Sequence, residues 1–190
     1  MILNGSSRRE DSVMSSADIM AMHQYLTFTL GDELFALDIG WVKEILDNTN
    51  ITRIPRMPDF IRGVINVREK AIPVIDLRLK FGMSGTVFTT NTCIIIAEVR
   101  TEGDFILIGL LADSVQEVLE LEQDRIDPPP RMGSAVDTRF LIGLGKLNER
   151  FVLILDIGRV FSNEELSTAR NAGGMATENM ETVVSASACP

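Results

Sequence analysis

The chain has 190 residues, 45% apolar and 24% charged, which is the balance of a soluble globular protein of one domain or two small ones. Its formal net charge of −9 argues against a nucleic acid or an anionic membrane as the main partner, because both select basic surfaces. The longest purely apolar runs are about five residues, whereas a membrane-spanning helix needs roughly twenty, so no direct membrane insertion is expected.

The two ends of the chain differ in composition from the part between them. Residues 1–22 are rich in Ser, Asp and Met, and residues 168–190 in Ala, Gly, Thr and Ser, so both are predicted to be flexible tails. No apolar segment follows the N-terminal charges, and no secretion signal is expected. The two cysteines, Cys93 and Cys189, fit free thiols in a reducing cytoplasm.

The central part, residues 23–167, reads as a series of short strands. Alternating polar and apolar side chains, stopped by Gly and Pro, are typical of half-buried strands joined by tight turns. Residues 41–46 fit a short helix or a strand equally well, and a short helical turn is expected through Phe81. The strands predicted in the first half cover residues 24–30, 33–38, 51–54, 61–67 and 72–76.

The second half of this region repeats the first. The matching segments are 42–46 with 115–119, Pro55 with Pro128, 61–64 with 141–144, 72–77 with 152–157, and Phe81 with Phe161. Several unlike residue types recur in order, which indicates an internal duplication. Each copy of about five short strands favours a small barrel without exposed sheet edges.

The predicted fold is therefore mainly β. It consists of two interlocked five-stranded β-barrel subdomains, roughly 23–90 and 91–167, with a groove between them and a few short helices. A last helix is expected over 158–167, unless residues 162–165 break it and restart it.

No convincing catalytic constellation is found. His23 is the only histidine, and no Cys-x-x-Cys or His-x-x-x-His pair occurs, so neither a metal nor a cofactor is expected. Asp76 and Asp156 end matching strands, and their recurrence favours a shared capping role over an acid pair. The sequence therefore points away from an enzyme.

Comparing the hairpin over residues 61–76 with its second copy distinguishes structural positions from positions that have become specialised. Residues shared by both copies indicate scaffold, and two such pairs are Gly63 with Gly143 and Glu69 with Glu149. Two positions differ: Asn66 is matched by Lys146, and Arg68 by Asn148. From chemistry alone, Arg68 is either a solvated turn charge or a side chain displayed for a partner.

Residues 60–68 and 72–78, which read FIRGVINVR and IPVIDLR, resemble the signature of the CheW chemotaxis coupling proteins. The segments 27–33, 42–45, 52–55 and 143–145 fit the same family in the same order, so the resemblance covers about residues 24–167. It implies two SH3-like five-stranded barrels and an adaptor without catalysis or cofactor.

The resemblance also implies partners and a place in the cell. Such proteins are cytoplasmic, are recruited to chemoreceptor arrays at the inner membrane, and couple methyl-accepting chemotaxis receptors to the regulatory domain of the histidine kinase CheA. The receptor's helical tip would lie in the groove between the barrels. The receptor-binding residues that the resemblance implies are Arg68, Val42, Glu44 and Ile45, and Asn66 is added because it differs between the two copies. Gly63, Glu69 and Gly143 are expected to be structural residues of the hairpins.

One residue departs from the family pattern. Glu69 stands where the family usually has Gly, and a non-glycine residue with positive φ costs roughly 1 kcal/mol or more. We therefore expect an altered turn, or a Glu69–Arg68 pair that competes with the receptor. Two alternatives remain open: a CheW-like scaffold of another chemosensory system, such as pili or development, and a small-barrel nucleic-acid-binding protein.

Overall fold

The computed structural model describes residues 22–47, 49–101, 103–129 and 136–186. The flexible tail predicted over 1–22 lies outside this part of the chain except for Met22. The described strands are β1 (Met22–Leu30), β2 (Glu33–Asp38), β3 (Val42–Asp47), β4 (Ile61–Val67), β5 (Lys70–Asp76), β6 (Cys93–Arg100), β7 (Phe105–Ala112), β8 (Ser114–Glu122), β9 (Leu141–Leu147) and β10 (Arg150–Leu155). The helices are α2 (Leu77–Lys80), α3 (Ile157–Val160) and α4 (Asn163–Ala186), with 3-10 turns η1 (Ile39–Trp41), η2 (Gln123–Arg125) and η3 (Thr138–Phe140).

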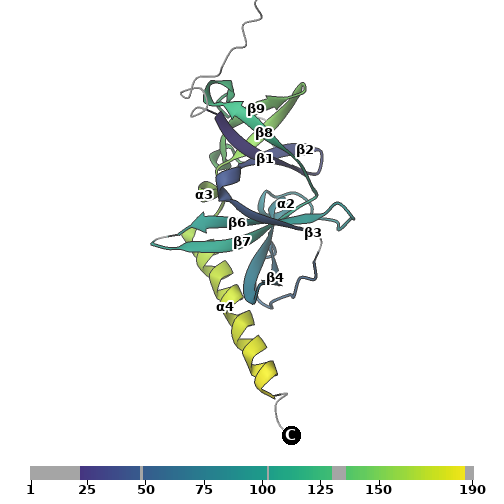
Figure 1. The fold of residues 1–190 in the computed structure, drawn as a ribbon, viewed down its shortest axis with the longest axis vertical. Helices are drawn as coiled ribbons and strands as arrows, with labels where there is room; N and C mark the ends of the chain where they lie inside the picture. The colour runs from purple at the N-terminus through teal and green to yellow at the C-terminus, as the bar shows by residue number, and fades with distance from the viewer. Residues whose placement is uncertain (1–21, 48, 102, 130–135, 187–190) are drawn as a thin grey trace, which may run out of the picture.

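The strands form two five-stranded sheets, which confirms the predicted mainly-β fold (Figure 1). Sheet A has the order β8-β1-β2-β10-β9, and sheet B has the order β3-β6-β7-β5-β4. Segment 41–46, which fits a helix or a strand, forms strand β3 from Val42 onward, and Trp41 ends the 3-10 turn η1.

The expected division into residues 23–90 and 91–167 does not describe these sheets. Each sheet takes a two-stranded hairpin from one copy of the repeat and three strands from the other. In each sheet one parallel pair connects the hairpin to the three strands of the other copy: β2–β10 in sheet A and β5–β7 in sheet B. The two copies have thus exchanged their first hairpins, which interlocks the two sheets.

Each sheet closes toward a barrel through a single bridge, which joins the segment that follows one outer strand to the outer strand at the other edge. In sheet B, Thr52 and Val64 exchange backbone hydrogen bonds of 2.8 and 2.9 Å, so the predicted strand over 51–54 is reduced to this bridge. In sheet A, Asp127 and Leu144 do the same at 2.9 and 2.8 Å.

The glycines matched between the two copies lie beside these bridges. A Cβ on Gly63 would be 2.1 Å from the Thr52 carbonyl oxygen, and one on Gly143 would be 2.4 Å from the Asp127 carbonyl oxygen. Only a residue without a side chain lets the closing strand approach so closely. Both glycines therefore leave room for the backbone that bridges the two edges of each sheet, which explains the structural role predicted for them.

The apolar core has three parts. One small cluster lies within sheet A and another within sheet B, while the largest cluster joins strands of both sheets. In this shared cluster four aromatic rings follow one another with centroids 5.8 to 5.9 Å apart: Phe28, Phe35, Phe81 and Phe140. Since close-packed aromatic contacts tolerate little displacement, the shared core fixes the two barrels against each other.

The two recurring aspartates cap helices, as the repeat indicates. The Asp76 carboxylate accepts hydrogen bonds from the backbone N–H groups of Arg78 and Leu79 at the start of α2. The Asp156 carboxylate accepts one from Gly158 at the start of α3. These bonds satisfy N–H groups that a helix start leaves without partners.

The flexible tail predicted over 168–190 is wrong for residues 168–186, because α4 continues through them. The chain breaks after α3 and restarts at Asn163, which was the alternative to one helix over 158–167. Ala169 and Ala172 are buried, and a Cβ on Gly173 would lie 2.7 Å from the Ala71 carbonyl oxygen of β5. Small residues at helical spacing thus seat α4 on sheet B, along which it runs in Figure 1.

Candidate protein-interaction site

The β4–β5 hairpin turns through just two residues, Arg68 and Glu69. Their φ angles are 51° and 67°, and the equivalent Asn148 and Glu149 have 45° and 67°. Positive φ at both central residues is the feature of the type I′ turns that suit twisted hairpins. Glu69 therefore adopts the left-handed backbone that was expected to be unfavourable for it, and the second copy does the same.

Arg68 is displayed at the tip of this rigid hairpin. Its side chain is 81% exposed, and its Nη2 lies 3.1 Å from Oε1 of Glu44 on β3. The structure thus pairs Arg68 with Glu44 rather than with Glu69. Exposed ion pairs contribute only about 0–1 kcal/mol, so this contact orients the guanidinium without withholding it from a partner.

The other predicted site residues surround this pair to different degrees. Asn66 is exposed on β4, two residues before the turn. Ile45 is 43% exposed, and strand alternation directs it to the face of β3 opposite Glu44. Val42 is half-buried and packs on the shared core. The structure therefore brings Arg68 and Glu44 into contact and leaves Val42 in a supporting position.

Sequence reasoning missed a cation held between the two sheets. Lys80 Nζ lies 2.5 Å from Oε1 of Glu165 and 5.0 to 5.9 Å from the ring centroids of Phe60, Phe161 and Phe140. Burial alone would raise the pKa of Glu165, but hydrogen bonds from Lys80 and Ser162 and the Lys80 charge outweigh it and lower that pKa. The sequence feature that could have predicted this contact is the internal repeat, because Lys80 stands where the second copy has the apolar Val160.

Other features of the described residues bear on the class of protein. Cys93 is a free thiol buried in β6, and burial raises its pKa. Within the described ranges, no group of three or more His, Cys, Asp and Glu side chains is placed to hold a metal. In the same ranges, no helix is long and apolar enough to cross a membrane.

Two small barrels locked by a shared core, with a charged hairpin as the displayed feature, define a protein-interaction scaffold. Residues 24–165 match the family described as CheW-like domain. The chain belongs to this family of chemotaxis proteins, which favours a chemotaxis adaptor over a nucleic-acid-binding barrel.

Individual relatives agree with the family match. The chemotaxis protein CheW of Klebsiella aerogenes is 38% identical over 148 residues, which cover 78% of this chain and 87% of that protein. The probable chemotaxis protein CheW of Rhizobium etli is 32% identical over 146 residues, covering 77% and 92%. The crystal structure of the scaffolding protein TtCheW from Thermoanaerobacter tengcongensis superposes with a TM-score of 0.67 at 32% identity, covering 84% of this chain and 96% of that one.

Proposed function

We propose that this chain is a non-enzymatic adaptor that couples the cytoplasmic tips of methyl-accepting chemotaxis receptors to the regulatory domain of the histidine kinase CheA. It acts in the cytoplasm and is recruited to receptor arrays at the inner membrane. The observation that carries the receptor site is Arg68, an 81% exposed guanidinium held on a two-residue turn. Family membership supports the coupling role.

Arg68 suits the rim of a site that receives a helix. Its planar fork matches a carboxylate or a pair of carbonyl oxygens, while its aliphatic stem packs against apolar side chains. Glu44 holds the guanidinium near β3 before the receptor arrives and is itself one-third exposed. A receptor carboxylate can share or replace this contact at little cost, because the pair is solvated.

Asn66 and Ile45 are the remaining members of the proposed receptor site. Asn66 adds an exposed amide on β4, and Ile45 supplies exposed apolar area on the other face of the edge strand β3, so the receptor helix would contact both faces of this edge. Helix recognition uses a few anchors of this kind in a shaped surface rather than a deep cavity. Val42 supports the surface from below through its contact with the shared core.

The outer face of sheet A offers a separate surface for packing barrel against barrel with the kinase. Among the described residues, exposed apolar side chains on its strands are Val118 at 47%, Ile142 at 47% and Phe151 at 63%. They come from β8, β9 and β10 of sheet A, whereas Arg68 stands on the β4–β5 hairpin of sheet B. An adaptor needs two such surfaces so that both partners are bound at once.

The receptor contact is tested by co-sedimentation with receptor-containing membranes. Arg68→Asn is the suitable variant, because Asn tolerates positive φ and is the residue of the second copy. We expect weaker sedimentation of Arg68→Asn and wild-type behaviour of the matched control, Asn148→Gly, which alters the other hairpin tip without straining its positive φ. Wild-type binding by a folded Arg68→Asn variant would remove Arg68 from the site.

A further inference from the structure

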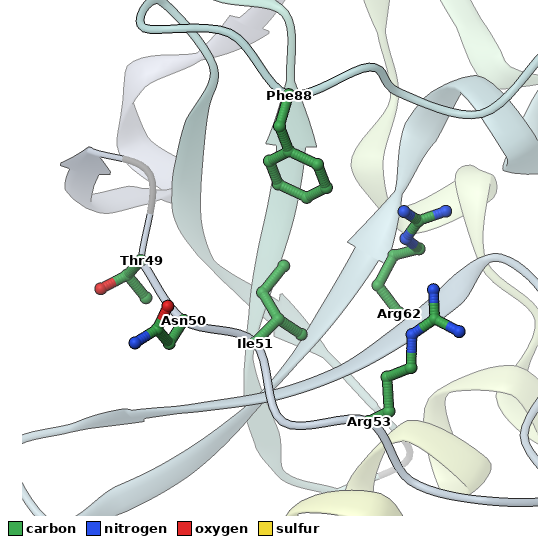
Figure 2. Close-up of a pocket in the computed structure, with 6 residues that line it drawn as sticks. All are labelled: Thr49, Asn50, Ile51, Arg53, Arg62 and Phe88. Atoms are coloured by element: carbon green, nitrogen blue, oxygen red, sulfur yellow. The ribbon is translucent and has the colours of Figure 1, made fainter.

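A second feature of sheet B belongs to neither the proposed receptor surface nor the proposed kinase surface. A cavity of about 250 Å³ opens between the segment after β3, strand β4 and the loop before β6 (Figure 2). Its lining consists of Thr49, Asn50, Ile51, Arg53, Arg62 and Phe88. Sites for drug-sized ligands enclose about 300–1,000 Å³, so this cavity fits one or two side chains rather than a cofactor.

Arg62 enters this cavity with its hydrogen-bonding capacity unused. Its side chain is only 24% exposed, and its Nη1 lies 3.7 Å from Oδ2 of Asp76, too far for a hydrogen bond. Asp76 is fully buried and already accepts hydrogen bonds from two backbone N–H groups of α2 and from the N–H and hydroxyl of Thr86. A guanidinium has five N–H donors, and Arg62 directs none of them to an acceptor among the described residues.

Arg53 adds a second cation to the cavity, and this one forms no ion pair with a described carboxylate. It is exposed, and among the described residues no acidic side chain lies within 4.0 Å of its guanidinium. Figure 2 shows both guanidinium groups on the same side of the opening, facing away from Thr49 and Asn50. The chain has a net charge of −9, so two neighbouring cations without an exposed counter-ion give this part of the surface a charge opposite to that of the whole chain.

An apolar wall lies beside the two cations. The Phe88 ring is 40% exposed, and the Arg62 guanidinium carbon is 5.9 Å from its centroid, within the range of a cation–π contact. Ile51 is half-buried in the segment after β3 that also carries Arg53 (Figure 2). The cavity therefore offers positive charge and apolar surface within the reach of one short peptide segment.

The internal repeat supplies a control for this arrangement. The closing bridges align Thr52 with Asp127, two residues away from the sequence match of Pro55 with Pro128. Arg53 therefore corresponds to Pro128 by the bridges and to Ile126 by the sequence repeat, and Arg62 corresponds to Ile142. Both cations are thus absent from the equivalent place on sheet A, although the backbone closure is the same. The cationic cavity is a specialisation of sheet B and not a requirement of the barrel.

We propose that this cavity binds an acidic side chain of a protein partner together with an adjacent apolar side chain. Arg53 and Arg62 hold the carboxylate, because paired guanidinium forks match its oxygens in geometry and charge. Phe88 and Ile51 contact the apolar neighbour. Arg62 and Arg68 stand at opposite ends of β4, roughly 20 Å apart along the strand, so this site does not depend on the proposed receptor contact.

The test is an NMR titration of the full-length ¹⁵N-labelled chain with two blocked tripeptides, acetyl-Leu-Glu-Leu-amide and acetyl-Leu-Gln-Leu-amide. We expect the Glu peptide to shift the amide signals of Asn50, Arg53, Arg62 and Phe88 and to bind at least tenfold more tightly than the Gln peptide. Arg53→Gln should weaken the Glu peptide about tenfold. The control Arg100→Gln, which removes an exposed cation at the end of β6, should leave binding unchanged.

Three results would overturn this proposal. The first is equal binding of the two peptides, and the second is wild-type affinity in Arg53→Gln. The third is displacement of the peptide by an equal concentration of inorganic phosphate, which would assign the cavity to a different anion. Since the Arg53 guanidinium is exposed and forms no ion pair with a described residue, its replacement tests binding rather than folding.

Discussion

Replacing Gly63 by alanine tests how sheet B closes. The new Cβ would stand 2.1 Å from the Thr52 carbonyl oxygen, and Gly63 has a φ of +142°, which L-residues rarely adopt. The backbone strain costs about 1 kcal/mol. Separating Thr52 from Val64 removes two hydrogen bonds at about 1 kcal/mol each, so the total is about 3 kcal/mol.

Urea denaturation of the purified variant measures this loss directly. For a chain of this length the melting temperature should also fall, by about 6–12 °C. Gly82→Ala is the matched control, because Gly82 has a φ of +76° but no heavy atom within 4 Å of the position its Cβ would take, so it reports backbone strain alone. If Gly63→Ala is no more destabilising than Gly82→Ala, the bridge does not hold the barrel and the reasoning is wrong.

Three further predictions concern the ion pairs and α4. Glu44→Gln should change the free energy of unfolding by less than about 1 kcal/mol, because its pair with Arg68 is exposed; a larger loss in urea titration would show that the pair is structural. The pKa of Glu165 is lowered in the folded state, so its contribution is present above the ordinary pKa of 4.5 and is lost as pH falls through the lower folded value. Acid unfolding should therefore be less steep in Glu165→Gln than in wild type, and an unchanged profile would contradict the pairing with Lys80. Gly173→Val should detach α4 from the β5 backbone and make the helix sensitive to limited proteolysis, whereas Gly174→Val, with open space at its Cβ, should not.

The internal repeat predicted much of the fold because local patterns survive duplication. Paired glycines and paired aspartates kept their roles in both copies, at the closing bridges and at the helix starts. The repeat could not predict the exchange of hairpins, since a strand's alternation is the same whichever copy it pairs with. The joins are parallel pairs between residues far apart in sequence, such as Val74 with Gly109, and carry no local signal.

The C-terminal helix was missed for a different reason. Its Ala- and Gly-rich composition predicts a flexible tail, but Ala169, Ala172 and Gly173 recur at the spacing of one helix face. Burial against β5, not intrinsic propensity, decides the outcome. Small residues signal close packing only when a partner surface is known.

The candidate site was predictable only in part. Arg68 stood out because its counterpart in the second copy is uncharged, but its contact with Glu44 depends on how β3 approaches the hairpin. The sequence does not predict the cationic cavity, because Arg53, Arg62 and Phe88 come from three separate segments. Their convergence depends on how the segments around sheet B come together in the fold.

The central claim is that the chain bridges receptor and kinase. The most direct measurement is the amount of CheA that co-sediments with receptor-containing membranes as this chain is added. We predict that CheA recovery rises with wild-type chain and saturates, and that Arg68→Asn shifts the rise to about 5–150-fold higher concentration, as expected for a contact of about 1–3 kcal/mol. CheA recovery that is independent of the chain would contradict the account.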